Sequence, residues 1–216
     1  MRIGHIDYLN LLPFYQFLKR KNIRIKKSYP AKVNIWFKRG VIDAAFISSI
    51  KAEKQTCFNA GIAAKAKVKS VLVCPGEGKD KESATSNVLA KILDIKGRVV
   101  IGDKAFKEKE CVDLAQIWYE KYNLPFVFAL FCTNRHHKEY QKLINKFLSQ
   151  KQKIPYSTLK KYADKTGISV KEAKDYLDNI IYYKLGWREK KALKKFWTLA
   201  RKLNAKWKPI SNRQST

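Results

Sequence analysis

The sequence predicts an α/β protein in which a mostly parallel sheet is followed by a helical tail. Through the first 131 residues, apolar segments of strand length alternate with amphipathic segments of helical period. Residues 42–47 are almost continuously apolar, which is typical of a strand in a parallel sheet covered on both faces. Later periodic segments all have helical spacing. The composition is also globular, because 45% of the residues are hydrophobic and 12% are aromatic.

Strands are predicted where short apolar runs are bounded by turn-forming residues. They cover residues 3–8, 23–25, 42–47, 68–73, 98–101 and 126–131. Helices fit between them, because Pro13 suits a first helical turn and the hydroxyls of residues 83–86 can cap a helix with an apolar face. These helices cover residues 13–18, 33–37, 88–93 and 112–122.

The helical tail is predicted from three amphipathic segments. Residues 140–148 carry apolar side chains at the i, i+3, i+4, i+7 and i+8 positions of one helix face. Ser169 and Glu172 form a capping box that opens a second helix, whose inner face extends to Ile181. Residues 193–203 form the last helix. Such stripes are typical of core packing rather than ligand binding.

Several classes of protein are disfavoured by the composition. No apolar run approaches the length of about 18 residues that predicts a membrane span, and the N-terminal residues lack the apolar stretch of a secretory signal, so we expect a cytoplasmic protein. Cys57, Cys74, Cys111 and Cys132 are widely separated, which predicts free thiols and neither a zinc site nor a disulfide framework. The net charge is +28, from 46 basic and 18 acidic residues, but the lysines are dispersed through every element. Dispersed charge is weak evidence for a nucleic-acid partner.

Small hydrogen-bonding residues recur where predicted strands end and loops lead into helices, which is where open α/β sheets bind ligands. Hydroxyls and free N–H groups at a helix start can hold a carboxylate, which the helix dipole also favours. The same residues can be ordinary caps or turn residues, and that alternative stays open. No histidine belongs to a triad or a metal-ligand cluster, and no glycine-rich phosphate loop is present. The candidate residues are Asn10, Ser48, Ser49, Thr85, Ser86, Asn87 and Asp103.

Five blocks of the sequence, in order along the chain, resemble the chorismate dehydratases of the futalosine route to menaquinone. The first contains a Tyr-Leu-Asn motif at residues 8–10 followed by Pro13. Tyr176, Leu177, Tyr183 and Phe196 also fit the helical tail of that family, so the resemblance spans nearly the whole chain. The five blocks are residues 2–13, 40–49, 83–86, 101–105 and 124–129.

The resemblance implies a two-lobed α/β fold like type II periplasmic binding proteins, with a helical C-terminal tail and a cleft between the lobes. Lobe 1 would comprise residues 1–72 and 131–216, and lobe 2 residues 73–130. Family members usually have a further strand and helix in the second lobe. In this chain residues 93–98 connect the helix that starts near residues 83–86 directly to the strand at residues 98–101. The second lobe is therefore expected to be unusually small.

The resemblance also implies an activity: the elimination of water from chorismate. Asn10 and Ser86 would be catalytic, holding the carboxylates and the leaving hydroxyl, while Ser48, Ser49, Thr85, Asn87 and Asp103 would bind substrate. No metal or organic cofactor is implied. The partner is a small molecule, with no membrane and no nucleic acid.

Two alternatives from other classes remain. Residues 157–162 and 169–180, joined by a turn at Gly167, have the spacing of a helix-turn-helix, which would make the chain a basic nucleic-acid-binding protein. A non-catalytic small-acid-binding protein would keep the same fold. Salt-dependent DNA retention would favour the first alternative, and chorismate binding without turnover the second.

Overall fold

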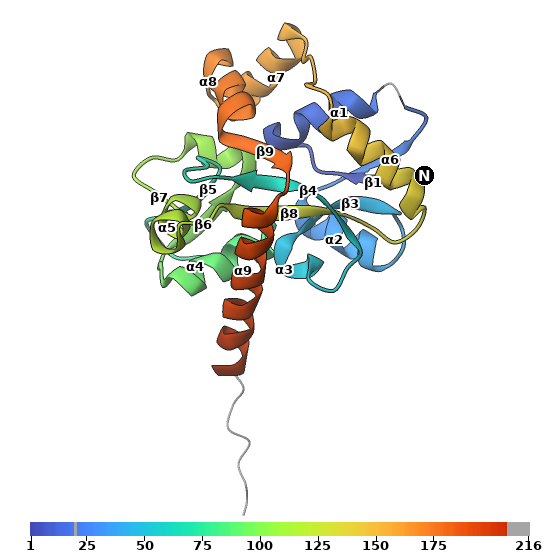
Figure 1. Cartoon of the computed structure of the whole chain (residues 1–216). Helices are drawn as coiled ribbons and strands as arrows, with labels where there is room; N and C mark the ends of the chain where they lie inside the picture. The colour runs from blue at the N-terminus through green and yellow to red at the C-terminus, as the bar shows by residue number, and fades with distance from the viewer. Residues whose placement is uncertain (20, 207–216) are drawn as a thin grey trace, which may run out of the picture.

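Two β-sheets and the helices that cover them make up the structure, which is a computed structural model that describes residues 1–19 and 21–206. The larger sheet has the strand order β2-β1-β3-β8-β4-β9, and the smaller sheet the order β6-β5-β7. The two sheets lie side by side in Figure 1, with the helical tail across them. The strands are β1 (Arg2–His5), β2 (Arg24–Lys27), β3 (Ala44–Ser48), β4 (Cys57–Ala64), β5 (Val71–Cys74), β6 (Arg98–Ile101), β7 (Val112–Asp113), β8 (Phe126–Thr133) and β9 (Ile181–Lys184).

The prediction of a mostly parallel sheet is wrong. Only β1 pairs in parallel, with β2 and β3, whereas β8 pairs antiparallel with both β3 and β4, and β9 pairs antiparallel with β4. The sequence analysis missed β4 because its alanines and Gly61 have little strand propensity. Gly61 is needed there, since a Cβ at this position would lie 2.4 Å from the carbonyl oxygen of Ala129 on the neighbouring strand.

The smaller sheet is entirely antiparallel, with β5 in its centre. Helix α4 (Ala84–Leu93) opens at Ser83, and α5 (Leu114–Tyr122) opens at Asp113, whose carboxylate accepts hydrogen bonds from Ala115 N and Gln116 N. One apolar cluster joins these helices to the tail through Trp118, which is fully buried. The predicted lobe boundaries at residues 72 and 131 stay a prediction. Residues 207–216, which the prediction assigns to lobe 1, lie outside the described residues.

Helices also cover the larger sheet. Phe14 of α1 (Leu12–Leu18) packs edge-on against Phe46 of β3 and Phe131 of β8, with ring centroids 5.2 and 5.5 Å apart. The other helical elements next to this sheet are η1 (Leu9–Leu11), α2 (Pro30–Lys38), α3 (Ser49–Ala52) and α6 (His137–Leu148).

The tail contains the predicted helices and one strand that was not predicted. The second helix is broken, because the helical turn η3 (Tyr176–Ile180) is followed by β9 at the edge of the larger sheet. Helix α9 (Trp187–Lys206) then packs Phe196 against Phe126 of β8, with ring centroids 5.2 Å apart, and its C-terminal end extends beyond both sheets (Figure 1). The Trp197 indole donates to the carbonyl of Ser49 at 2.9 Å, which ties α9 to α3. The first part of the broken helix is α8 (Val170–Asp175), and α7 (Tyr156–Thr166) precedes it.

The prediction of free thiols is wrong, because Cys57 is bonded to Cys132 and Cys74 to Cys111. Cys57 and Cys132 face each other across β4 and β8. The second pair continues the register in which Val73 opposes Val112. The partners are 75 and 37 residues apart, so only the strand pairing reveals them.

No helix within residues 1–19 and 21–206 is long and apolar enough to cross a membrane.

Candidate functional site

A cavity of about 70 Å³ lies where the two sheets meet, and both sheets contribute to its wall. Asn10 enters from the loop after β1, Ser48 from the end of β3, and Thr85 and Ser86 from the first turn of α4. None of the residues that line it carries a charged side chain, although 46 of the chain's residues are lysine or arginine. Its polar lining residues are Tyr8, Asn10, Ser48, Ser70, Ser83, Thr85, Ser86 and Tyr176.

Ser83 and Ser86 form a reciprocal pair at the start of α4. The Ser86 backbone N–H donates to Ser83 Oγ at 3.1 Å, and the Ser83 hydroxyl donates to Ser86 Oγ at 2.8 Å. The pair is buried, with Ser86 only 2% exposed. Because Ser86 Oγ accepts from Ser83, its own O–H remains available to donate to a group in the cavity, beside the positive end of the helix dipole.

The loop that carries Asn10 is fixed from three sides. The Leu9 N–H donates to Asp103 Oδ1 at 2.8 Å, and the Tyr183 hydroxyl donates to the Asn10 carbonyl at 2.7 Å. The Asn10 side chain also lies beside the hydroxyl of Tyr176, whose pKa is raised by burial. Asn10 Oδ1 is buried and accepts no hydrogen bond within the described structure. A buried amide oxygen without a donor is costly unless a ligand or water supplies one.

Ser48 and Thr85 both line the cavity but also have protein partners. The Asn34 amide donates to Ser48 Oγ at 2.8 Å and accepts from the Ser48 N–H at 3.2 Å. Thr85 Oγ1 accepts from the Ile50 N–H at 3.3 Å, which joins α4 of the smaller sheet to α3 of the larger one. These bonds hold the two hydroxyls in place at the junction.

Three candidate residues do not line the cavity. Ser49 is fully buried and its hydroxyl donates to the Val127 carbonyl. The Asn87 amide donates to the Asp80 carbonyl at 2.7 Å and accepts from the Asp80 N–H at 3.1 Å, which closes the loop before α4. Asp103 lies 2.9 Å from the Lys165 ammonium and accepts from the Leu9 N–H. In the structure each of the three therefore supports a wall of the cavity.

Sequence reasoning missed Tyr8, Ser70 and Tyr176 as lining residues. Tyr8 belongs to the Tyr-Leu-Asn motif, but nothing in the pattern distinguished it from a core aromatic. Its hydroxyl donates to Glu82 Oε2 at 2.5 Å, and this bond joins the loop after β1 to the loop before α4. Burial, followed by the Glu82 hydrogen bond, raises the pKa of Tyr8. Ser70 and Tyr176 gave no local signal, because only tertiary folding brings them together.

The histidines are placed outside the cavity. His5 is buried in β1, stacks on Tyr15 with ring centroids 4.5 Å apart, and lies 3.8 Å from Asp7 Oδ1. Burial lowers the pKa of His5, while the neighbouring His5 is the main cause that lowers the pKa of Asp7. His5 is therefore a neutral core residue, and His136 and His137 are exposed at the start of α6.

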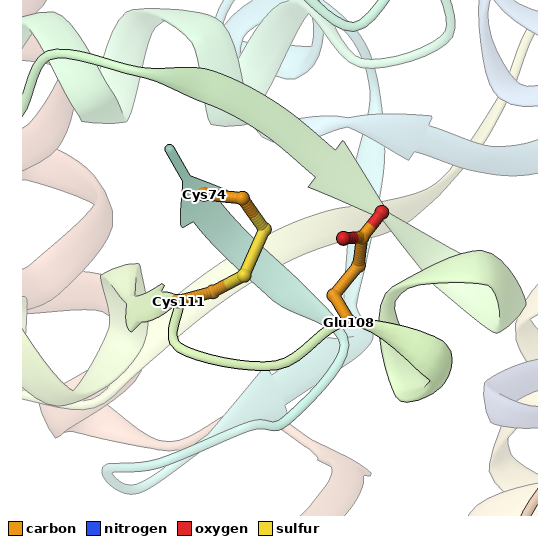
Figure 2. A group of neighbouring side chains, drawn as sticks. All are labelled: Cys74, Glu108 and Cys111. Carbon is orange, nitrogen blue, oxygen red and sulfur yellow. A yellow bond between two sulfur atoms is a disulfide. The ribbon is translucent and has the colours of Figure 1, made fainter. Parts of the chain in front are cut away.

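One group of side chains has the composition of a metal site. Cys74, Cys111 and Glu108 place their ligand atoms within 4.8 Å of one another (Figure 2). However, the two sulfurs are bonded to each other, and both Glu108 oxygens accept from Arg98 at 3.0 Å. These atoms are already engaged, so we assign no metal to this group.

The helix-turn-helix spacing corresponds to α7 and α8, joined through Gly167. Helix α8 has only six residues, and Ala173 and the adjoining Tyr176 face inward. A recognition helix needs a long exposed face to enter a groove of DNA. With six residues, α8 provides fewer than two turns of such a face, which argues against the nucleic-acid alternative.

The chain is similar to proteins of known sequence over nearly its whole length. A family model described as menaquinone biosynthesis matches residues 1–98 and 94–202. A chorismate dehydratase from Campylobacter jejuni is 41% identical over 223 residues, which cover 94% of this chain and 99% of that protein.

Solved structures share the fold at low identity. Protein AF1704 from Archaeoglobus fulgidus aligns with a TM-score of 0.68 at 15% identity, over 94% of this chain and 97% of that one. The periplasmic aliphatic sulphonate binding protein SsuA from Escherichia coli aligns with a TM-score of 0.62 at 13% identity, over 99% and 96%. The predicted fold like that of periplasmic binding proteins is thus confirmed.

Proposed function

Because this chain belongs to the menaquinone biosynthesis family, we propose that it is a chorismate dehydratase. The reaction would remove water from chorismate to give 3-[(1-carboxyvinyl)oxy]benzoate, through loss of a ring proton at C3 and the hydroxyl at C4. Aromatisation of the ring makes this elimination strongly downhill. The task left to the protein is orientation of the substrate and stabilisation of charge that develops on the ring and its carboxylate.

The observation that carries the proposal is that Asn10, in η1 after β1, and Ser86, in the first turn of α4, line one cavity whose lining side chains are uncharged. Ser86 offers a hydroxyl donor at a helix start, and the Asn10 amide offers both a donor and an acceptor. Thr85, Ser48 and the first N–H groups of α4 would complete the cradle for a carboxylate. Ser49, Asn87 and Asp103 would act indirectly, by holding the segments that carry these groups.

The cavity lining suggests where the proton goes. Tyr8 and Tyr176 are its ionisable side chains, and burial is the largest cause that raises the pKa of each. Both therefore stay protonated near neutral pH and are poor bases. We propose that the enolpyruvyl carboxylate of the substrate itself takes the C3 proton, that this proton then leaves with the C4 hydroxyl as water, and that the reaction needs no metal or organic cofactor.

The decisive experiment is incubation of the purified protein with chorismate, followed by ultraviolet spectra and product mass. We expect loss of the diene absorbance and a product lighter by one water. Asn10→Ala should lower the rate by about 10²-fold, the cost of one transition-state hydrogen bond. Tight binding with an unchanged spectrum would instead support the non-catalytic binding alternative.

The proposed cytoplasmic location needs its own test. Disulfides are rare in reducing compartments, whereas the four cysteines of this chain are paired. Thiol alkylation in intact cells, followed by mass spectrometry, would measure the state of each pair. Cysteines that are all reduced in the cell would favour the cytoplasm, and persistent disulfides would favour an oxidising compartment.

A further inference from the structure

Tyr176 brings the helical tail into the cavity. It begins η3, a π-helical turn, and is 1% exposed. Its hydroxyl oxygen lies 2.8 Å from Ser70 Oγ, next to β5, and both residues line the cavity. π-helical turns inside helices are frequent at functional sites, because they redirect one side chain out of helical register.

The geometry of this pair leaves one hydrogen free. When two hydroxyls bond to each other, one O–H is used between them and the other remains available to donate. Burial raises the pKa of Tyr176, although Ser70 and the Asn10 side chain act in the opposite direction. The pair is therefore a neutral donor throughout the physiological pH range.

The position of the Tyr176 hydroxyl is rigidly held. Its ring packs edge-on against Phe106, with centroids 5.0 Å apart and planes at 89°. The same tail supplies Tyr183, whose hydroxyl donates to the Asn10 carbonyl at 2.7 Å. The tail thus fixes the Asn10 backbone and places a second polar group beside the Asn10 side chain.

We propose that the hydroxyls of Ser70 and Tyr176 form a substrate-binding subsite that donates a hydrogen bond to a carboxylate oxygen next to Asn10. The inference rests on the proposed dehydratase function, and it adds a segment of the tail to the substrate-binding residues. A dianionic substrate in a cavity lined by uncharged side chains depends on every neutral donor. Hydrogen bonds to a charged group are stronger than those between neutral groups.

Tyr176→Phe tests the subsite while keeping the ring that packs on Phe106. We expect kcat/KM for chorismate to fall by about tenfold to a hundredfold, from the loss of one hydrogen bond to a charged group. The product, which keeps both carboxylates, should bind with a dissociation constant raised by a similar factor. Tyr140→Phe is the matched control, because Tyr140 is equally buried and donates to the Arg2 carbonyl outside the cavity.

Ser70→Ala provides a second, smaller change in the same subsite. It should lower kcat/KM in the same direction, and the double variant should lose less than the product of the two single effects, because the two hydroxyls act as a unit. Thermal unfolding of each variant separates loss of function from loss of fold.

The outcomes separate this inference from the proposed function. Wild-type turnover of chorismate with unchanged kcat/KM and product binding in both Tyr176→Phe and Ser70→Ala would overturn the subsite and leave the dehydratase proposal standing. Equal losses in Tyr140→Phe would reduce Tyr176 to a structural residue and also overturn the subsite. A wild-type protein that leaves chorismate unchanged would overturn the function and the subsite with it.

Discussion

Ser86→Ala is the sharpest test of the cavity. The substitution removes the hydroxyl that is free to donate, while the Ser86 backbone N–H keeps its bond to Ser83 Oγ. Loss of one preorganised donor to developing charge costs about 10²–10³-fold in kcat, or about 2.7–4 kcal/mol. The Ser83 hydroxyl also loses its acceptor, which should lower the free energy of unfolding by about 1 kcal/mol. A domain with a stability of about 5–15 kcal/mol remains folded after such a loss.

The assay is the initial rate of chorismate consumption at saturating substrate, with urea unfolding of the same preparation. Ser169→Ala is the control, because Ser169 also hydrogen-bonds at the start of a helix, as the N-cap of α8, but at an exposed position away from the cavity. It should cost about 1 kcal/mol of stability and leave kcat unchanged. A Ser86→Ala protein with kcat within about threefold of wild type, which is less than 1 kcal/mol, would refute the assigned role of the hydroxyl.

Three further predictions concern the framework. Gly102 has φ +68°, and a Cβ at this position would lie 2.6–2.9 Å from atoms of the Tyr8 ring. Gly102→Ala should therefore destabilise the protein by about 1–2 kcal/mol and raise KM for chorismate. A variant with the KM and melting temperature of the wild type would contradict this. Replacing Cys57 and Cys132 by serine removes a disulfide whose partners are 75 residues apart and should lower the free energy of unfolding by about 4 kcal/mol. Denaturant titration of the variant and the wild type measures this, and equal stabilities would contradict it. Burial lowers the pKa of His5 in the folded protein from its ordinary value of 6.5. As the pH falls below 6.5, the unfolded state therefore binds more protons at His5 than the folded state does, and the free energy of unfolding should decrease. His5→Phe should weaken this dependence relative to the exposed control His137→Gln, and identical pH profiles would show that His5 does not cause it.

Local sequence was sufficient for features that depend on nearby residues. The helix cap comes from the predicted group of hydroxyls at residues 83–86, with Ser83 as the N-cap. The capping box at Ser169 and Glu172 forms as predicted, because the partners are three residues apart. The near-continuous apolar run became β3, with all five residues buried. Four of the seven candidate residues line the cavity, namely Asn10, Ser48, Thr85 and Ser86.

Features that depend on distant residues were decided only by the tertiary structure. The disulfide partners meet because β4 and β7 pair with strands far away in the sequence. β4 itself forms although its residues have weak strand propensity, since its neighbours β8 and β9 supply hydrogen bonds on both sides.

By itself, the sequence determined the alternation of strands and helices, the caps, and the polar residues at strand ends. These depend on side-chain chemistry within one or two turns of chain. The tertiary structure decided the direction of the strands, the pairing of the cysteines, and the meeting of Ser70 with Tyr176, which are 106 residues apart. The physical reason is that burial and long-range hydrogen bonding are properties of the assembled core, so no local pattern encodes which distant hydroxyl will face the cavity.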